Sequence, residues 1–301
     1  MNRRRFLAFS AGTAGLLPRL AFAASEPHLD FPAAPRDRLS VATYPFRKLL
    51  NPKSGTMKLE DFPALVVLRF GLHMMEPLSD HFPSTDAAYL RRFKESLDKA
   101  GVRVANIPVN PHASLYDPDT QKREAAITKT KQWIDTAIAF GAPSIRVSII
   151  GVKGIKPDVE RTVESLKSIA KYGQSKNVLV NLENDDPRSE DAFFITEVIT
   201  KAGNPYLRAL PDFCNSMIEK DGDEAFNYAA LKAMFKHAYN ISHVKDSEMD
   251  GTRLYRVDVG KCFDIAKASG YRGYFSMEWE GQGEPFAGTK SLIDLSLKNL
   301  S

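Results

Sequence analysis

The sequence predicts a single-domain (β/α)8 TIM barrel that follows an N-terminal signal peptide. Eight runs of β-favouring apolar residues alternate strictly with helical patterns, as expected for a parallel sheet covered by helices. The 301 residues are enough for one barrel, which usually needs about 250 residues. The nucleotide-binding open sheet is disfavoured, because the turn after the first strand, Pro45-Phe46-Arg47-Lys48, lacks the glycines that this fold needs.

The elements follow from apolar periodicity and from the residues that punctuate it. The predicted strands are Leu39–Tyr44, Gly71–Glu76, Val102–Val109, Ser144–Ile150, Val178–Glu183, Leu207–Asp212, Ile241–Lys245 and Gly273–Glu278. The predicted helices are Leu59–Phe70, Ala87–Ala100, Lys122–Phe140, Val159–Ser175, Glu190–Ala202, Glu224–Ala238, Val257–Ser269 and Thr289–Leu300. Four of these helices are followed by a glycine, which helix C-termini prefer: Gly101, Gly141, Gly203 and Gly270.

Charge and composition exclude a nucleic-acid-binding role. Apolar residues make up 43% of the chain and charged residues 26%, as in ordinary globular proteins. The net charge is +4, but the four arginines of Met1–Ala23, a segment without acidic residues, account for all of it. The rest of the chain is therefore neutral and offers no basic surface for nucleic acid or an anionic membrane.

Residues 1–23 are predicted to be a twin-arginine signal peptide. The run Arg3-Arg4-Arg5-Phe6-Leu7 matches that export motif, an apolar stretch follows, and Ala21-Phe22-Ala23 is a small-x-small cleavage site. An ordinary secretory signal is the alternative, and both routes lead to the periplasm. No cysteine lies near the cleavage site, so we expect no membrane anchor after cleavage. Residues 24–38 are predicted to be a linker, and residues 39–301 the barrel.

Four chemically useful side chains follow four consecutive strands. Glu183 ends the apolar run that begins at Val178, and Asp212, His243 and Glu278 occupy similar positions on the next three strands. The carboxyl ends of barrel strands meet at one face, where active sites of this fold are built. Three carboxylates and one imidazole suit a single divalent ion, Mn, Mg, Co or Zn, better than a structural zinc site, which would use cysteine.

Three of these residues also have a purely structural interpretation. Glu183 could help to cap the next helix, Asp212 could begin an Asx-turn, and His243 alone would be a satisfied core histidine. Glu280 lies two residues after Glu278, on the same face of a strand, so either could be the ligand. Four such residues in order are a stronger signal than any one of them.

The chain resembles the xylose isomerase-like barrels of the sugar phosphate isomerase/epimerase family. The most specific motifs are Asn181-Leu182-Glu183-Asn184, His243-Val244-Lys245-Asp246 and Ser276-Met277-Glu278-Trp279-Glu280-Gly281. In similar ketose epimerases and inosose dehydratases the matching Glu, Asp, His and Glu bind one divalent metal, and the two glutamates move the substrate proton. The resemblance therefore implies Glu183, Asp212, His243 and Glu278 as ligands, with Glu183 and Glu278 as catalytic residues. Endonuclease IV shares the barrel but needs more histidines.

The resemblance implies a small carbohydrate substrate and contacts for it in the loops. The candidate substrate-binding residues are Glu76, His81, His112, Asn215, Lys245 and Glu280. Asn215 is a departure, because the similar epimerases have a histidine there, and an amide can donate to a hydroxyl but does not titrate near neutrality.

We expect proton abstraction next to a carbonyl of a non-phosphorylated keto sugar, since sugar phosphates are cytoplasmic and this chain is expected to be exported. A lyase that releases the aglycone of a 3-keto-glycoside by β-elimination is one alternative, and a non-catalytic sugar-binding barrel is another. The sequence does not define the sugar, the metal or the oligomeric state.

Overall fold

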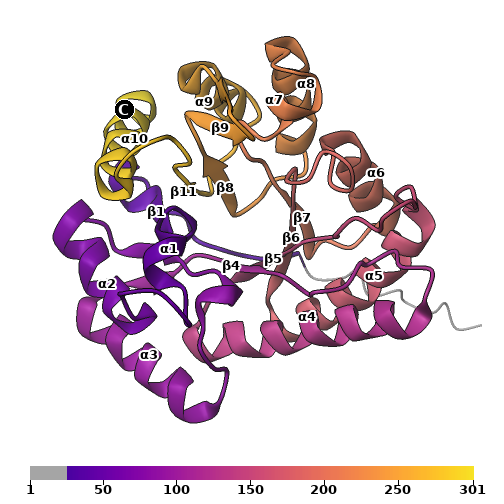
Figure 1. Ribbon diagram of the computed structural model, residues 1–301, viewed down its shortest axis with the longest axis horizontal. Coiled ribbons are helices and arrows are strands. Elements are labelled where there is room, and N and C mark those ends of the chain that lie inside the picture. Colours follow the sequence, from indigo (N-terminus) through magenta and orange to yellow (C-terminus); the bar gives the residue numbers. More distant parts are fainter. Residues whose placement is uncertain (1–25) are drawn as a thin grey trace, which may run out of the picture.

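The computed structural model describes residues 26–301 and confirms the TIM barrel as one domain. Parallel strands occupy the centre, and helices surround them in chain order (Figure 1). The predicted signal peptide lies outside the described residues. None of the helices in residues 26–301 is long and apolar enough to cross a membrane.

Eight strand positions form the barrel wall, and the third is split into two short strands. The strands are β1 (Leu39–Ala42), β2 (Met74–Glu76), β3 (Arg103–Val104), β4 (Ile107–Val109), β5 (Ser144–Val147), β6 (Leu179–Glu183), β7 (Leu207–Leu210), β8 (Ile241–Val244) and β11 (Tyr274–Met277). An unpredicted antiparallel hairpin, β9 (Ser247–Asp250) with β10 (Arg253–Arg256), follows β8. The predicted strands were longer than the observed ones by a few residues at most of their ends.

The main helices agree with the predictions to within a few residues at most ends. They are α3 (Ala87–Ala100), α4 (Thr120–Phe140), α5 (Val159–Lys176), α6 (Ala192–Ala202), α8 (Glu224–Phe235), α9 (Val259–Ala268) and α10 (Pro285–Leu300). Short helices α1 (Arg47–Leu50) and α7 (Ser216–Glu219) lie in loops, and the predicted helix 59–70 consists of a 3-10 turn, α2 (Phe62–Leu65) and a π-helical turn.

Aspartates begin the helices and glycines end several of them. The Asp side chain accepts a backbone N–H at the start of six helices: Asp86, Asp119, Asp158, Asp191, Asp223 and Asp258. Gly101, Gly141 and Gly203 take the left-handed conformation at the opposite ends. These caps satisfy backbone groups that a helix cannot pair internally.

Two sheets join to close the barrel. One sheet has the order β3-β2-β1-β11-β8 and the other β4-β5-β6-β7. They meet through the split third strand on one side. On the other side, parallel bridges connect Ala209 with Ala238 and Asp212 with His243. His243 N donates to Pro211 O at 3.0 Å, so two of the predicted metal ligands lie at the closure itself.

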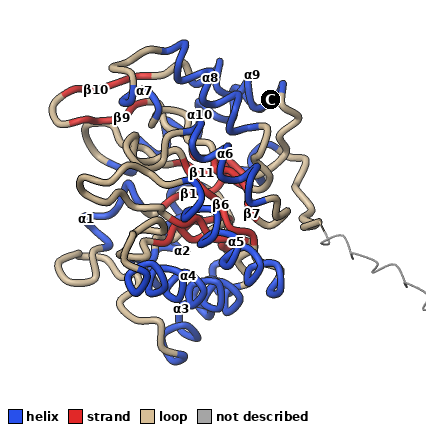
Figure 2. The backbone as a smooth tube through the Cα atoms, turned by 90° about the vertical axis from the view of Figure 1, so that its right-hand side faces the viewer, coloured by secondary structure: helices blue, strands red, loops and turns tan. Residues whose placement is uncertain are grey.

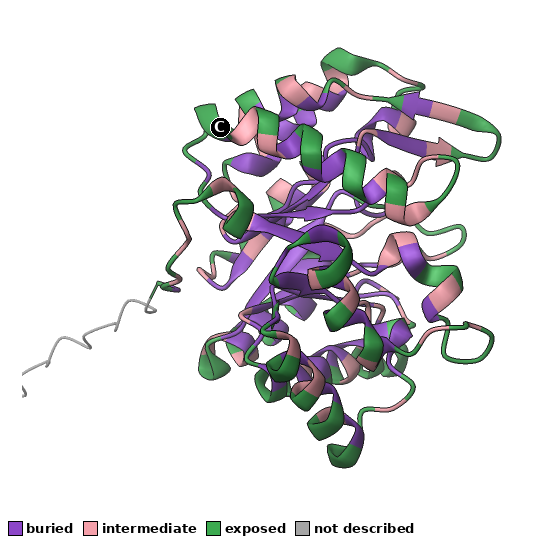
Figure 3. Ribbon diagram, turned by 90° about the vertical axis from the view of Figure 1, so that its left-hand side faces the viewer, coloured by how far each residue is buried: buried purple, intermediate pink, exposed green. Residues whose placement is uncertain are grey.

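The strands and inward helix faces are buried, and the outer helix faces are exposed (Figure 3). One polar layer interrupts this apolar core beneath the predicted site. Asn240 Nδ2 donates to Ser144 Oγ at 2.8 Å, and Ser144 Oγ donates to Asn106 Oδ1 at 2.6 Å. Asn181 Nδ2 donates to Asn240 Oδ1 at 3.1 Å. Because these side chains bond one another, most polar atoms of the layer are paired, and Asn181 Oδ1 is the exception.

The segment expected to be a linker is packed against the barrel over residues 26–38. The Phe31 ring lies edge-on to the rings of Tyr239 and Tyr274, with centroids 5.6 and 5.7 Å away, and Leu29 N donates to the Tyr239 hydroxyl at 3.0 Å. The aromatic ring covers apolar surface that a fully solvated segment would expose. This segment and the β9–β10 hairpin lie at opposite ends of the barrel (Figure 2).

Candidate metal centre

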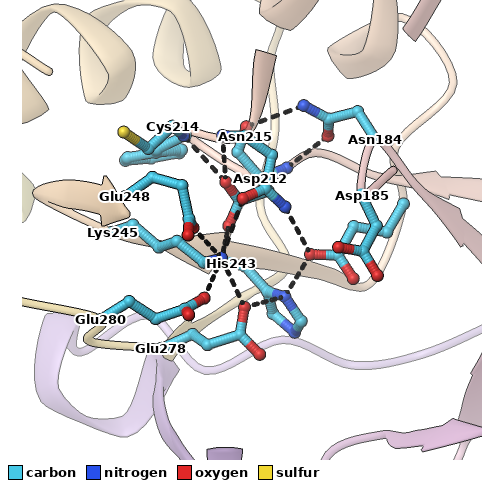
Figure 4. Close-up of polar contacts among 12 residues, drawn as sticks. Asn184, Asp185, Asp212, Cys214, Asn215, His243, Lys245, Glu248, Glu278 and Glu280 are labelled. Carbon is cyan, nitrogen blue, oxygen red and sulfur yellow. Dashed lines mark hydrogen bonds and ion pairs between the residues drawn. The ribbon is translucent and has the colours of Figure 1, made fainter. Parts of the chain in front are cut away.

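The structure brings the four predicted ligands together. Glu183 ends β6, Asp212 follows β7, His243 lies in β8 and Glu278 follows β11. All four are buried, and one ligand atom from each lies within 4.8 Å of the others. Asp212, His243 and Glu278 point toward a common space (Figure 4). Glu278 rather than Glu280 belongs to this group.

His243 is held by carboxylates on both sides of its ring. Its Nδ1 lies 2.7 Å from Glu183 Oε1 and 3.0 Å from Glu278 Oε2, and its Nε2 lies 2.9 Å from Glu76 Oε2. Burial opposes the imidazolium, but Glu183, Glu278 and Glu76 outweigh it and raise the pKa of His243 well above its ordinary value. The Nδ1 atom therefore faces the other three ligands, while Glu76 fixes the orientation of the ring.

The two carboxylate oxygens of Asp212 have different surroundings. Its Oδ1 accepts from Cys214 N and Asn215 N, both at 2.8 Å, which is the predicted Asx-turn. Its Oδ2 is buried and has no hydrogen-bond partner. Burial raises the pKa of Asp212 well above its ordinary value, with Lys245 opposing this and Glu183 adding to it.

The donor set fits a divalent cation. A buried carboxylate oxygen without a partner is costly, and a cation among the four ligand atoms would satisfy the Asp212 Oδ2 atom and offset the repulsion between carboxylates. Three oxygens and one imidazole nitrogen suit the ions predicted from the sequence. Asp191, not Glu183, caps α6, so Glu183 is not needed for a cap.

Arg146 is a site residue that the sequence patterns did not indicate. Its Nη2 lies 2.5 Å from Glu183 Oε2 and 3.2 Å from Asp185 Oδ2. Burial disfavours the ionised carboxylate of Glu183, but Arg146 and His243 outweigh this and hold its pKa below the usual range. An arginine in the middle of the buried strand Ser144–Val147 was the available signal, because a buried charge needs a partner.

Lys245 organises a second group of polar side chains. Its Nζ donates to Asn215 Oδ1 at 2.9 Å and to Glu248 Oε2 at 2.7 Å, and it also bonds Glu280. Burial opposes the charge on Lys245, but Asp212 and the nearby glutamates outweigh it and raise its pKa well above the ordinary value. Lys245 therefore remains a cation, and it lies 3.4 Å from Glu278 Oε2.

A cavity of about 210 Å³, here called the inner pocket, opens onto these groups. Its wall includes the predicted residues Lys245, Glu278 and Glu280, together with Tyr44, Arg146 and Asp185, which were not predicted. Asn215 is not in the wall but lies behind it, since its amide donates to Glu183 Oε1 at 3.5 Å and accepts from Lys245.

Three predicted substrate-binding residues lie elsewhere. Glu76 is fully buried, bonds His243 and Asn106, and does not line the inner pocket. His81 is buried, and its Nδ1 lies 2.9 Å from Thr43 Oγ1. His112 is exposed and lines a different cavity. The prediction placed these residues correctly in loops or at strand ends, but it did not resolve which way the side chains turn.

The neutral state of His81 predicts a pH dependence of stability. Burial lowers the pKa of His81 to about 4, with Asp80 opposing the shift. In the unfolded chain His81 becomes protonated below about pH 6.5, whereas in the folded protein it stays neutral down to about pH 4. The free energy of unfolding therefore has its full value above about pH 6.5 and falls as the pH is lowered toward 4. We expect His81→Asn to reduce the fall in unfolding free energy over this range by up to about 3 kcal/mol.

Urea denaturation between pH 4 and 7 measures this difference. His112→Asn is the matched control, because that histidine is exposed and its replacement should leave the pH dependence of the unfolding free energy as in the wild type. The same pH dependence in wild type and His81→Asn would contradict the role given to His81.

The contact between Glu76 and His243 predicts a role in metal affinity. Carboxylates that orient a ligating histidine typically contribute a factor of about 10–100 in affinity. Glu76→Gln keeps the side-chain shape but removes the charge, so it should weaken Mn²⁺ binding by about that factor. Titration calorimetry with Mn²⁺ measures it without any assay of activity.

Glu164→Gln serves as the control, because Glu164 is exposed on α5. If Glu76→Gln bound Mn²⁺ as tightly as the wild type, with its fold intact by circular dichroism, Glu76 would have no role in metal affinity.

Solved structures share this fold at low sequence identity. A xylose isomerase-like TIM barrel protein from Mycobacterium smegmatis, solved in complex with magnesium, superposes with a TM-score of 0.69 at 14% identity, covering 89% of this chain and 99% of that one. D-Psicose 3-epimerase from Clostridium cellulolyticum H10, solved with D-tagatose, gives 0.66 at 15% identity, covering 87% and 96%. The 3-keto-D-glucoside 4-epimerase from E. coli gives 0.66 at 13% identity, covering 87% and 99%.

No curated protein matches the chain. The family described as xylose isomerase-like TIM barrel matches residues 66–299, which is most of the barrel, including all four predicted ligands. The chain therefore belongs to the xylose isomerase-like TIM barrel family.

Proposed function

We propose that this protein is a divalent-metal-dependent sugar isomerase or epimerase that acts on a non-phosphorylated keto sugar. The observation on which this depends is the convergence of Glu183, Asp212, His243 and Glu278. The Oδ2 atom of Asp212 in this group is buried and has no hydrogen-bond partner. The inner pocket beside them contains hydrogen-bonding groups suited to hydroxyls. The named relatives include epimerases of keto sugars, which supports the same class of substrate.

A divalent cation bound here would act as a Lewis acid toward a substrate carbonyl. The protein supplies further positive charge through Lys245, which lines the inner pocket and remains protonated. A fixed cation at the place where negative charge develops is a strong contribution to catalysis in a water-poor site. Lys245 is held there by Asn215, Glu248 and Glu280.

The two predicted catalytic glutamates occupy different environments. Glu278 lines the inner pocket, so it can take the proton from a substrate carbon directly. Glu183 is 1% exposed and is paired with Arg146. We infer that Glu278 is the base and that Glu183 acts as a ligand and as the proton carrier on the opposite side. Return of the proton to the other face gives epimerisation, and its return to the next carbon gives isomerisation.

Charge in the inner pocket supports a substrate without phosphate. The wall contains four carboxylates and two cations: Asp80, Asp185, Glu278, Glu280, Arg146 and Lys245. Both cations already bond carboxylates, Arg146 with Glu183 and Lys245 with Glu280. A phosphate dianion would therefore find no unpaired cationic side chain in this wall.

Replacement of Glu278 tests the mechanism. We expect Glu278→Gln to reduce the exchange of solvent deuterium into a keto sugar by about 10²–10⁴-fold, the usual contribution of a positioned base. Glu183→Gln should also abolish turnover and leave the fold intact. Nuclear magnetic resonance of the sugar in D₂O, with Mn²⁺-loaded protein, measures the exchange, and Glu164→Gln is again the control.

Full exchange in either glutamate variant would remove that residue from the mechanism. Binding of the sugar by the wild type without exchange or turnover would favour the non-catalytic sugar-binding barrel. Release of an aglycone from a 3-keto-glucoside would favour the lyase.

We further propose that the protein is exported to the periplasm by the twin-arginine route. The support is the sequence of residues 1–23, with its paired arginines, short apolar stretch and small-x-small site. That compartment contains free sugars and glycosides rather than sugar phosphates, in agreement with the charge of the inner pocket.

Conservative replacement of the paired arginines tests the route. The full chain with Arg3→Lys and Arg4→Lys should accumulate in the cytoplasm, because the translocase recognises the arginines and not their charge alone. Arg19→Lys, outside the motif, should leave export unchanged. Cell fractionation and immunoblotting measure the distribution, and equal export of both variants would favour an ordinary secretory signal.

A further inference from the structure

A second and larger cavity lies beside the inner pocket. This side cavity has a volume of about 890 Å³, against about 210 Å³ for the inner pocket. Asn110, Ser148 and Asp185 line both cavities, so the two meet at these residues. A ligand that occupies the inner pocket has the side cavity as its neighbouring free space.

The side cavity is built by three loops, those after β4, β5 and β6, which buried polar groups hold in place. Glu190, 3% exposed, accepts from Ile149 N at 2.7 Å and so ties the loop after β6 to the loop after β5. The buried Tyr116 hydroxyl accepts from Val152 N at 3.1 Å. These bonds fix the backbone of the wall from behind and leave the cavity open.

The wall also contains a strained residue. Ile150 has a φ of 61°, a left-handed conformation that is an outlier for a β-branched side chain. Such strain costs on the order of 1–3 kcal/mol and persists where the surrounding bonds impose it, often at ligand sites. Ile150 lines the side cavity, and its neighbour Ile149 is the residue that Glu190 holds.

The volumes indicate a substrate with two parts. At about 30 Å³ for each water, the inner pocket corresponds to roughly seven waters, which is space for one sugar ring. Pockets for larger ligands span about 300–1,000 Å³, a range that includes the side cavity. A free monosaccharide would leave the side cavity unused.

The wall chemistry suits a second sugar ring. Hydroxyl, amide and charged groups come from Ser148, Asn110 and Asp185, and apolar surface comes from Ile150 and Ile155. A sugar ring presents both hydroxyl edges and an apolar face, so it matches this mixture.

We propose that the side cavity is a substrate subsite and that the natural substrate is a glycoside of at least two sugar rings. The sugar ring that carries the keto group occupies the inner pocket, and the second ring, attached to it, occupies the side cavity. This inference rests on the proposed function for the chemistry at the inner pocket, but the subsite makes a separate prediction about binding.

Ile155 offers a test that spares the metal centre. It lines the side cavity and is 38% exposed, so Ile155→Trp should fill part of the cavity without disturbing the core. We expect the wild type to show a KM at least tenfold lower for 3-keto-trehalose than for 3-keto-glucose in the deuterium-exchange assay. Ile155→Trp should raise the KM for 3-keto-trehalose about tenfold or more and leave that for 3-keto-glucose unchanged.

Ile138→Trp is the matched control, because Ile138 is similarly exposed, at 46%, but lies on α4 away from the cavity. Binding of both sugars by calorimetry gives a readout that does not depend on turnover. Equal KM values for the two sugars, or equal effects of Ile155→Trp on both, would overturn the subsite and leave the proposed function standing. Tighter binding of the disaccharide, weakened by Ile155→Trp but without exchange, would support the subsite and overturn the proposed chemistry.

Discussion

The negative charge around His243 is the constraint on which the rest of the site depends. Carboxylates of Glu76, Glu183 and Glu278 contact the two ring nitrogens at 2.7–3.0 Å, and all are buried. Removing such ions from water costs several kcal/mol each unless they are paired. The strands that end here must therefore carry cationic side chains as well as the ligands, and Arg146 of β5 is one of these side chains.

Barrel closure and ligand placement depend on the same backbone pairs. The bridge between Asp212 and His243 joins the two sheets, so the separation of these two ligands is set by parallel-strand geometry. Asn184 adds to this, because its side chain bonds both the N–H and the carbonyl of Asp212. A site built on hydrogen-bonded strands is more precise than one built on loops. The ligands are accordingly in place without any loop having to close.

The sequence predicted the parts of this arrangement that depend on local patterns. Periodicity and the glycines that follow helices located the helices, and polar residues after apolar runs located the four ligands. What it could not supply were contacts across the barrel. Glu76 and His243 are 167 residues apart, and only closure brings them together. Arg146 and Glu183 lie on neighbouring strands, but nothing local fixes the direction of a long side chain. Phe31 was missed because a single aromatic in a Pro-rich segment gives no period.

The two cations of the site divide the carboxylates unequally. Arg146 pairs with Glu183 and Asp185, while Lys245 bonds Glu248 and Glu280 and approaches Asp212 Oδ2 only to 3.9 Å. Asp212 is therefore the ligand least compensated by the protein, and its raised pKa reflects this. Burial of an incompletely compensated carboxylate favours its protonated form. A divalent ion held by the four ligands would favour the ionised form of Asp212 and would satisfy its free oxygen. Metal binding would then stabilise the fold as well as supply the chemistry, which agrees with the proposed export of the protein in a folded state.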